Sequence, residues 1–486
     1  MKSERSEKIP LHISDQNLER VKLIYPEWLS YLIVIAIPLL HLCSYALSLV
    51  IINQYSYYAF MKEKFPNETD KTEPLPTCTV NTSTTKYEHQ LEIQKIASQW
   101  NIYCNLAYLI PALFMNINLA TYSDVYGRKL FFIVPLVGSL LKCTLNSIGI
   151  YFEINIRLLL IFNMLEACTG SWIATLSMAL CFISDTTETG KRRSFIIGVL
   201  EGCLGIGGFI ATLISGYIIE GTDGFFYPEV TAAGIVGLGL LLVIFIQETL
   251  LESRKRQHVS IFENMKRVTE CYTSDFSPKG NRWMFVILLL IFAMSSISNL
   301  GRGGVETLYQ LNSPFCWNSI DIGTFNAVRA FCWNIGALLI IKVFHVWTSD
   351  EIIALVGCIT SVASLIVEGL ADSGLMLYIL SLGCTVTMPM VRGIMSHMTP
   401  ADKQGSVYAG VAAMEVFCAL IGAVSINVLY SSTVDIFRGL TFLIWSAFGS
   451  IGIVLCIIFI LGTWRNDLVS SVREPKHRVD DEETAQ

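Results

Sequence analysis

The sequence predicts an all-α membrane protein in which twelve spanning helices form two six-helix bundles around a central cavity. The chain of 486 residues is 53% hydrophobic and only 15% charged, which is less charge than a soluble surface of this size requires. Its apolar residues gather in blocks of about 20, and each block is long enough to cross a bilayer as a helix. A polar segment, 251–282, divides these blocks into six and six.

The apolar blocks predict the spans 28–53, 99–120, 130–151, 156–181, 195–219, 230–249, 283–310, 322–345, 351–371, 373–395, 406–430 and 437–462. Residues 28–250 then form an N-terminal bundle and residues 283–462 a C-terminal bundle, joined by the linker 251–282. An even number of spans puts the two tails, 1–27 and 463–486, on the same side of the membrane.

Charge predicts which side that is, because lysine and arginine mark the cytosolic side of a membrane protein. The cationic loop residues that share one face are Arg128, Lys129, 191–193, 254–256 and Lys403. The short loops on the other face carry the acids Glu220, Asp223, Glu229, Asp321 and Asp372. Both tails and the linker are therefore expected in the cytosol. Residues 1–25 show no signal-peptide pattern, so the first span is expected to direct insertion.

The predicted external loop, 54–98, carries two glycosylation sequons, which begin at Asn67 and Asn81. Of the 14 cysteines, only Cys78 and Cys316 fall in predicted external loops. Thiols in an oxidising space can pair, so we expect a disulfide between them, with two free thiols as the alternative.

The polar gap 123–129 forces a tight hairpin between the second and third spans, and its glycine permits the sharp bend. The gap resembles the loop signature of the major facilitator superfamily, Gly-x-x-x-Asp-x-x-Gly-Arg-[Arg/Lys], with alanine in place of the first glycine. The matching residues are Asp124, Gly127, Arg128 and Lys129. The resemblance implies a loop that controls switching between outward-facing and inward-facing states. The alternative is a loop that only sets topology.

Ionisable side chains within spans are costly and usually face a water-filled interior. The candidates are His41, Lys142, Glu166, Glu201, Arg302, Glu306, Arg329, Glu368, Arg392 and Glu415. Glu201 lies in a glycine-rich run that lets helices approach closely beside a cavity. Arg392 follows Pro389, which interrupts the helix and can aim the guanidinium at a cavity. The alternative for each is a structural ion pair, and Lys142 and Glu368 lie near span ends.

Five stretches resemble solute carrier family 46, the family of the proton-coupled folate transporter. They are 123–129, Arg192-Arg193 with Leu200-Glu201, Thr307-Leu308-Tyr309 with 313–317, 389–392 and Gln404-Gly405. The resemblance implies that Glu201 couples protons, that Arg392 contacts substrate, and that Cys78 and Cys316 form an external disulfide.

Two positions depart from the folate transporter. Asn299 stands where that protein has a histidine, and Ser171 stands where it has an aspartate. We expect both residues near the substrate, together with Glu415. Glu166, five residues before Ser171, is the second candidate for proton coupling. These departures predict that folate is not the main substrate; folate itself, haem and muropeptide-like solutes are the alternatives.

The sequence thus predicts a proton-coupled secondary active transporter of a small organic anion that works by alternating access, as a monomer, with the proton as its coupling ion. A carboxylate that gains and loses a proton in a low-dielectric cavity suits that role, and an arginine suits an anionic substrate. The alternative is a transporter-like receptor or nutrient sensor. No metal site and no nucleophile with a base is evident, so an enzyme is not expected. A net charge of −6 without a basic patch argues against nucleic acid.

The expected location is the plasma membrane. The segment 19–24, Glu-Arg-Val-Lys-Leu-Ile, fits an acidic dileucine sorting pattern. It makes the endosomal or lysosomal membrane the alternative.

Overall fold

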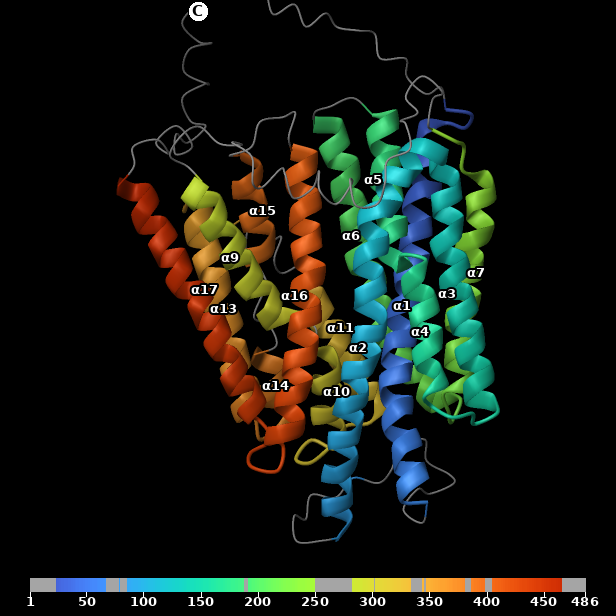
Figure 1. The fold of residues 1–486 in the computed structure, drawn as a ribbon, viewed down its shortest axis with the longest axis vertical. Helices are drawn as coiled ribbons and strands as arrows, with labels where there is room; N and C mark the ends of the chain where they lie inside the picture. The colour runs from blue at the N-terminus through green and yellow to red at the C-terminus, as the bar shows by residue number, and fades with distance from the viewer. Residues whose placement is uncertain are drawn as a thin grey trace, which may run out of the picture.

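The computed structural model describes residues 23–66, 78, 85–187, 191–249, 282–300, 302–333, 343–344, 347–380, 386–397 and 404–465. Helices fill almost all of these residues, and no β-strand occurs among them (Figure 1). Nine of the described helical segments are long and apolar enough to cross a membrane. The prediction of an all-α membrane protein is therefore confirmed.

The helices of the N-terminal half correspond to the first six predicted spans. They are α1 (Glu27–Lys64), α2 (Thr85–Tyr126), α3 (Arg128–Tyr151), α4 (Leu158–Cys168) with α5 (Ser171–Thr186), α6 (Lys191–Gly221), and α7 (Phe226–Leu242) with the 3-10 turn η1 (Val243–Phe245). The connection between α1 and α2 is shorter than the predicted loop 54–98, because both helices continue past their apolar blocks. Tyr57 and Met61 are buried, and this packing explains why α1 continues. Asn67 and Asn81, the predicted glycosylation sites, lie outside the described residues.

The helices of the C-terminal half correspond to the last six predicted spans. They are α9 (Arg282–Asn299) with α10 (Gly303–Leu311), α11 (Ser319–Phe331), α13 (Asp350–Leu370), α14 (Gly374–Leu380) with α15 (Thr387–His397), α16 (Gln404–Thr433) and α17 (Leu440–Arg465). Spans 4 and 7 are thus each divided into two helices, and in span 10 the described helices α14 and α15 lie on either side of residues 381–385, which are outside the described residues.

The division of span 4 has a local backbone cause. Gly170 has φ +91°, which a glycine adopts without steric penalty, and Ser171 follows with φ +56°. In span 10, Pro389 lies in the first turn of α15, where a proline forfeits no helical hydrogen bond. Divided helices at membrane depth leave backbone groups for neighbouring helices or a cavity to satisfy.

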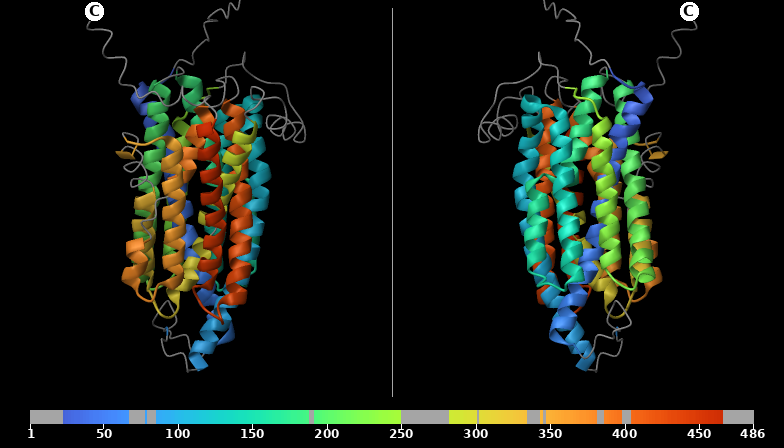
Figure 2. Two further views of the ribbon diagram at one scale, coloured as in Figure 1. Left: turned by 90° about the vertical axis from the view of Figure 1, so that its left-hand side faces the viewer. Right: turned by 90° about the vertical axis from the view of Figure 1, so that its right-hand side faces the viewer.

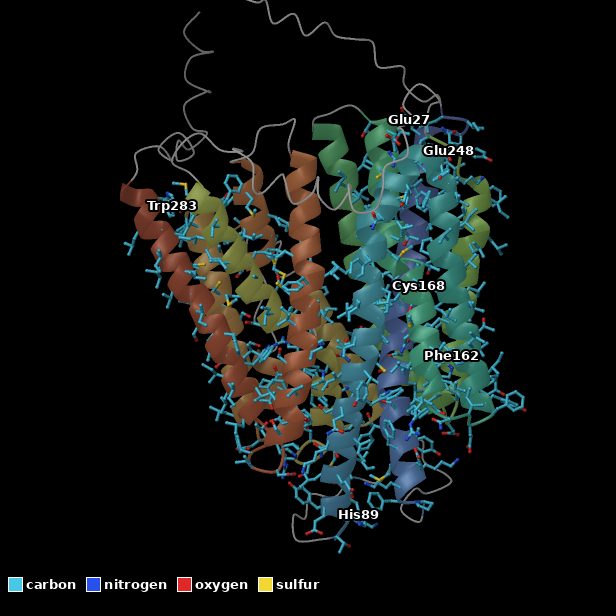
Figure 3. All side chains as sticks on the ribbon, viewed as in Figure 1. Glu27, His89, Phe162, Cys168, Glu248 and Trp283 are labelled. Atoms are coloured by element: carbon cyan, nitrogen blue, oxygen red, sulfur yellow. A yellow bond between two sulfur atoms is a disulfide. The ribbon has the colours of Figure 1, made fainter. Side chains whose placement is uncertain are left out.

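The two halves lie side by side, with their helices along the long axis of the molecule (Figure 1). Glu27, Glu248 and Trp283 lie at one end and His89 lies at the other, as Figure 3 shows. The start of the first span, the end of the sixth and the start of the seventh therefore share one end, as the even number of spans in each half predicts. At the opposite end, α1 and α2 extend beyond the other helices (Figure 2).

The halves meet through α6 on α11 and α2 on α16. Glycine allows α6 and α11 to touch backbone to backbone. A Cβ at Gly216 would lie 2.3 Å from the carbonyl oxygen of Ser319, and one at Gly323 would lie 2.9 Å from that of Thr212. No larger side chain fits either position without displacing a helix.

Hydrogen bonds and apolar packing join the halves near the His89 end. Tyr57 donates to Asn312 Oδ1 at 2.8 Å, and Tyr430 donates to Gln94 Oε1 at 2.7 Å. A buried apolar cluster there combines residues of both halves; its members include Tyr57, Ile93, Tyr309, Phe325, Tyr430 and Trp445. The predicted disulfide between Cys78 and Cys316 is present. This end of the molecule is therefore closed.

Candidate functional site

The hairpin between α2 and α3 is held by an acid at the end of the sixth span. Glu248 accepts the backbone N–H of Arg128 at 2.8 Å and that of Lys129 at 3.0 Å. These are the first amides of α3, whose N-terminus favours an anion. Gly127 has φ +108°, and a Cβ there would lie 2.6 Å from Glu248 Oε2. Glu248 was not among the residues predicted to have a role, although an acid at the end of an apolar block is a visible signal.

Arg128 is buried rather than solvated in its loop. Its Nε lies 3.2 Å from Asp185 Oδ2 at the end of α5, and its NH1 donates to Ser123 at 2.5 Å. Arg128 therefore fixes the hairpin to span 4. The side chain of Asp124 lies outside what the structure describes. The role of this loop in switching stays a prediction.

Arg392 and Glu415 form an ion pair that joins α15 to α16. The side chain of Arg392 is 38% exposed and that of Glu415 is 33% exposed, so neither is fully covered by other residues. The guanidinium lies over the ring of Phe292, 5.4 Å from its centroid. The sequence left such a pair open as the alternative for Arg392, and the structure contains it in a partly exposed position.

Asn299 and Ser171 are both buried and already bonded. Asn299 accepts from Ser361 at 3.0 Å and donates to the carbonyl of Ser295 at 2.8 Å. Ser171 lies at the break in span 4, where its hydroxyl is 2.6 Å from that of Tyr108. The structure does not bring these residues to the Arg392 pair in this conformation.

An aromatic group surrounds the break in span 4. The ring of Tyr45 stacks on Tyr108 at 5.8 Å and lies 6.1 Å from Trp172. Lys142 lies 6.0 Å from the centroid of Tyr45. The aromatic group therefore borders a buried cation.

Glu166 lies in a buried polar chain that crosses three spans. His41 Nδ1 lies 3.0 Å from Thr175 Oγ1, and His41 Nε2 lies 2.6 Å from Ser139 Oγ. Ser139 donates to Glu166 Oε1 at 2.7 Å. Lys142 Nζ lies 3.4 Å from the other oxygen of Glu166.

The chain continues from Lys142 to the sixth span. Lys142 donates to Ser48 at 2.9 Å, and Ser48 donates to Glu229 Oε1 at 2.7 Å. Asn146 donates to the same oxygen at 3.1 Å. We call His41, Glu166, Lys142 and Glu229, with the hydroxyls that link them, the N-terminal network.

Glu229 corrects a sequence prediction. The charge pattern placed it in an external loop, but it lies in the first turn of α7 and is fully buried. Hydropathy assigns an acid at a span end to the adjacent loop, and only packing against Ser48 and Asn146 reveals its depth. Lys142, for which the sequence left a structural ion pair open, lies buried in a pair with Glu166.

The C-terminal half holds a second buried cluster, which we call the C-terminal network. Arg302 Nε lies 2.8 Å from Glu306 Oε1, and Arg302 NH1 lies 3.5 Å from Glu368 Oε2. Arg329 pairs with the other oxygen of Glu306. Both guanidinium groups lie over the ring of Trp333, at 5.3 and 5.2 Å from its centroid.

A small cavity adjoins the C-terminal network. It is lined by Arg302, Phe325, Arg329, Ser364, Glu368, Met376 and Leu377. It has room for roughly one water molecule. It is too small for an organic substrate in this conformation.

Glu201, the first candidate for proton coupling, lies in α6, but its side chain lies outside the described residues. Its role therefore stays a prediction. Among the described residues, no group of histidine, cysteine, aspartate and glutamate side chains has the arrangement of a metal site.

Comparison with known sequences reveals one family. The profile of the Major Facilitator Superfamily matches residues 79–423. The lysosomal proton-coupled steroid conjugate and bile acid symporter of Gallus gallus is 24% identical over 454 residues, covering 91% of this chain and 97% of the relative. The proton-coupled folate transporter of Bos taurus is 23% identical over 359 residues, covering 73% of this chain and 77% of the relative.

Comparison with solved structures reveals the same architecture. The human organic anion transporter TETRAN has a TM-score of 0.58 and 14% identity, covering 89% of this chain and 100% of that one. The nucleoside transporter NupG has a TM-score of 0.63 and 11% identity, covering 89% and 99%. At sequence identities this low, the similarity shows a shared fold only.

Proposed function

The chain belongs to the major facilitator superfamily, and on this premise we propose that it uses proton movement to drive the transport of a small organic anion. It is a multi-pass membrane transporter rather than an enzyme, and its curated relatives are members of solute carrier family 46. The proposal adds the coupling ion and the class of substrate.

One observation carries the proposal, namely the partly exposed ion pair between Arg392 and Glu415. An arginine keeps its charge at any physiological pH, and its planar donors match a carboxylate or sulfate with two parallel bonds. Glu415 occupies those donors, so an anionic substrate must displace it. A displaced anionic Glu415 would leave two negative groups beside one cation.

A proton removes that excess charge. When Glu415 is protonated, the substrate anion and Arg392 balance each other without a second carboxylate. Proton and substrate therefore favour each other's binding, and this reciprocal coupling is what a symporter requires. Phe292, which lies under the guanidinium, offers an apolar surface to the body of the substrate.

The names of the relatives support this class of substrate. Steroid conjugates, bile acids and folates are organic anions with large apolar or aromatic bodies. The lysosomal relatives, together with the dileucine pattern at 19–24, favour the lysosomal alternative over the plasma membrane. Replacing Leu23 and Ile24 by alanine should then move the tagged protein from lysosomes to the cell surface, as imaging would show.

The transport test uses purified full-length protein in liposomes, with radiolabelled cholate and folate as probes and an imposed pH gradient. Wild-type protein is expected to accumulate at least one probe, and to do so only when the source side is acidic. Arg392→Lys keeps the charge but loses the planar fork, so KM should rise by roughly tenfold. Arg157→Lys, at an exposed arginine, is the matched control.

Glu415→Gln tests the counterion directly. The amide mimics the protonated acid, so the KM of the variant should no longer depend on pH. A variant whose KM keeps the full pH dependence would contradict the role of Glu415, and an unchanged KM in Arg392→Lys would contradict the role of Arg392.

A further inference from the structure

The N-terminal network is buried within the N-terminal half. Its four ionisable groups come from α1, α3, α4 and α7, and His41, Lys142, Glu166 and Glu229 are each at most 4% exposed. Their links form one continuous path from Thr175 to Glu229. The network is separate from the Arg392 pair, which lies in the other half.

The charges of the network do not balance without an additional proton. Two carboxylates and one lysine leave a net charge of −1 when His41 is neutral. An uncompensated charge buried from water is strongly unfavourable. One additional proton, on the imidazole or on a carboxyl group, brings the net charge to zero.

The hydrogen bonds also indicate that the network holds one additional proton. Thr175 donates to the carbonyl of Trp172 at 2.7 Å, and Ser139 donates to Glu166. Each hydroxyl has only one hydrogen, so both can only accept from His41, whose two ring nitrogens then both carry hydrogen. A neutral His41 requires a hydroxyl to turn, or Glu166 to hold the proton and pass it through Ser139.

Glu229 lies at the other end of the path. Its Oε2 is buried and has no hydrogen-bond partner among the described residues, so its negative charge is only partly compensated. Among the described residues, the other titratable groups that face the network are Tyr45, Tyr108 and Cys143. These are neutral at physiological pH and do not change the count.

We propose that the N-terminal network binds one exchangeable proton, as a second proton site distinct from Glu415. The proton belongs to the network as a whole, since hydrogen bonds and one ion pair link His41, Glu166 and Glu229 through Ser139, Lys142 and Ser48. Its contribution to transport rests on the proposed function, whereas the binding of the proton does not.

Infrared difference spectra test the binding without any substrate. They compare the full-length protein in lipid at acidic and alkaline pH, and they detect protonation of carboxyl and imidazole groups. Wild-type protein is expected to show a protonation change that Glu166→Gln and Glu229→Gln both alter. The control, Glu153→Gln, changes an exposed carboxylate and should leave the change intact.

Transport variants test the charge count. Without the additional proton the net charge is 0 in Glu229→Gln and −2 in Lys142→Gln, compared with −1 in the wild type. The pH dependence of the maximal rate should therefore shift toward acidic pH in Glu229→Gln and toward alkaline pH in Lys142→Gln. The double variant restores −1 and should restore the wild-type pH dependence, which a purely structural defect would not do.

The results separate the two proposals. The pH dependence of KM reports on Glu415, and the pH dependence of the maximal rate reports on the network. Shifts in the same direction in both single variants, or a double variant that stays shifted, would overturn the network proposal. Infrared spectra that are identical in wild type, Glu166→Gln and Glu229→Gln would overturn it even if neither probe is transported.

Discussion

The two halves of the molecule each bury a cluster of charges, and the clusters differ in kind. The N-terminal network has one lysine, one histidine and two glutamates, whereas the C-terminal network has two arginines and two glutamates. The first balances only with an additional proton. The second balances by itself, with cations that do not titrate.

The difference teaches that burial alone does not make a proton site. Arg302 and Arg329 also lie over the ring of Trp333, and the ion pairs of the C-terminal network join α10, α11 and α13. In the N-terminal network, hydroxyl groups link the charges and can reverse their donor roles.

The largest loss of stability is expected when a substitution breaks the charge balance of the C-terminal network. Glu306→Gln leaves two buried arginines with one glutamate, and removing one partner of a buried pair costs about 3–5 kcal/mol. The variant should unfold at a clearly lower temperature, measured by tryptophan fluorescence in detergent. Glu153→Gln, at a glutamate whose side chain is 67% exposed, should change that temperature little. Equal unfolding temperatures would contradict the comparison.

A smaller loss of stability is expected when the charge of the C-terminal network is kept and only the planar shape of one cation is lost. Arg329→Lys loses the planar contact with Trp333 and Phe325, which is worth about 1–2 kcal/mol when desolvated. The unfolding temperature should fall by less than in Glu306→Gln. If Arg329→Lys proves as damaging as Glu306→Gln, geometry rather than charge balance governs this half.

The smallest effect is expected in the N-terminal network. Glu166→Gln leaves Lys142 and Glu229, which balance without a proton, so the cost is mainly the altered bond from Ser139, about 1 kcal/mol. The same unfolding measurement should place this variant closest to the wild type. A loss as large as in Glu306→Gln would show that both networks are fixed joints.

Hydropathy predicted the helices well because each span is a long apolar block, and this signal does not depend on which other helices pack against the span. It also identified Glu166, Arg392 and Glu415 as costly residues within spans. It could not predict that Arg392 pairs with Glu415, because the contact depends on how α15 packs against α16. The break in span 4 was missed as well, although Gly170 supplies a local signal for it.

The acids at span ends were the hardest to place. Glu229 was assigned to a loop, and Glu248 was not considered, yet each is bonded to a neighbouring helix. A sequence read one span at a time cannot show which acid turns inward, since that depends on side chains from other spans.

The disulfide between Cys78 and Cys316 has a consequence for the covalent topology of the molecule. With the peptide chain it closes a ring that contains the linker 251–282. A single cut within that linker opens the ring but leaves the two bundles bonded to each other. A nicked chain would therefore migrate as one molecule until a reductant separates it into halves.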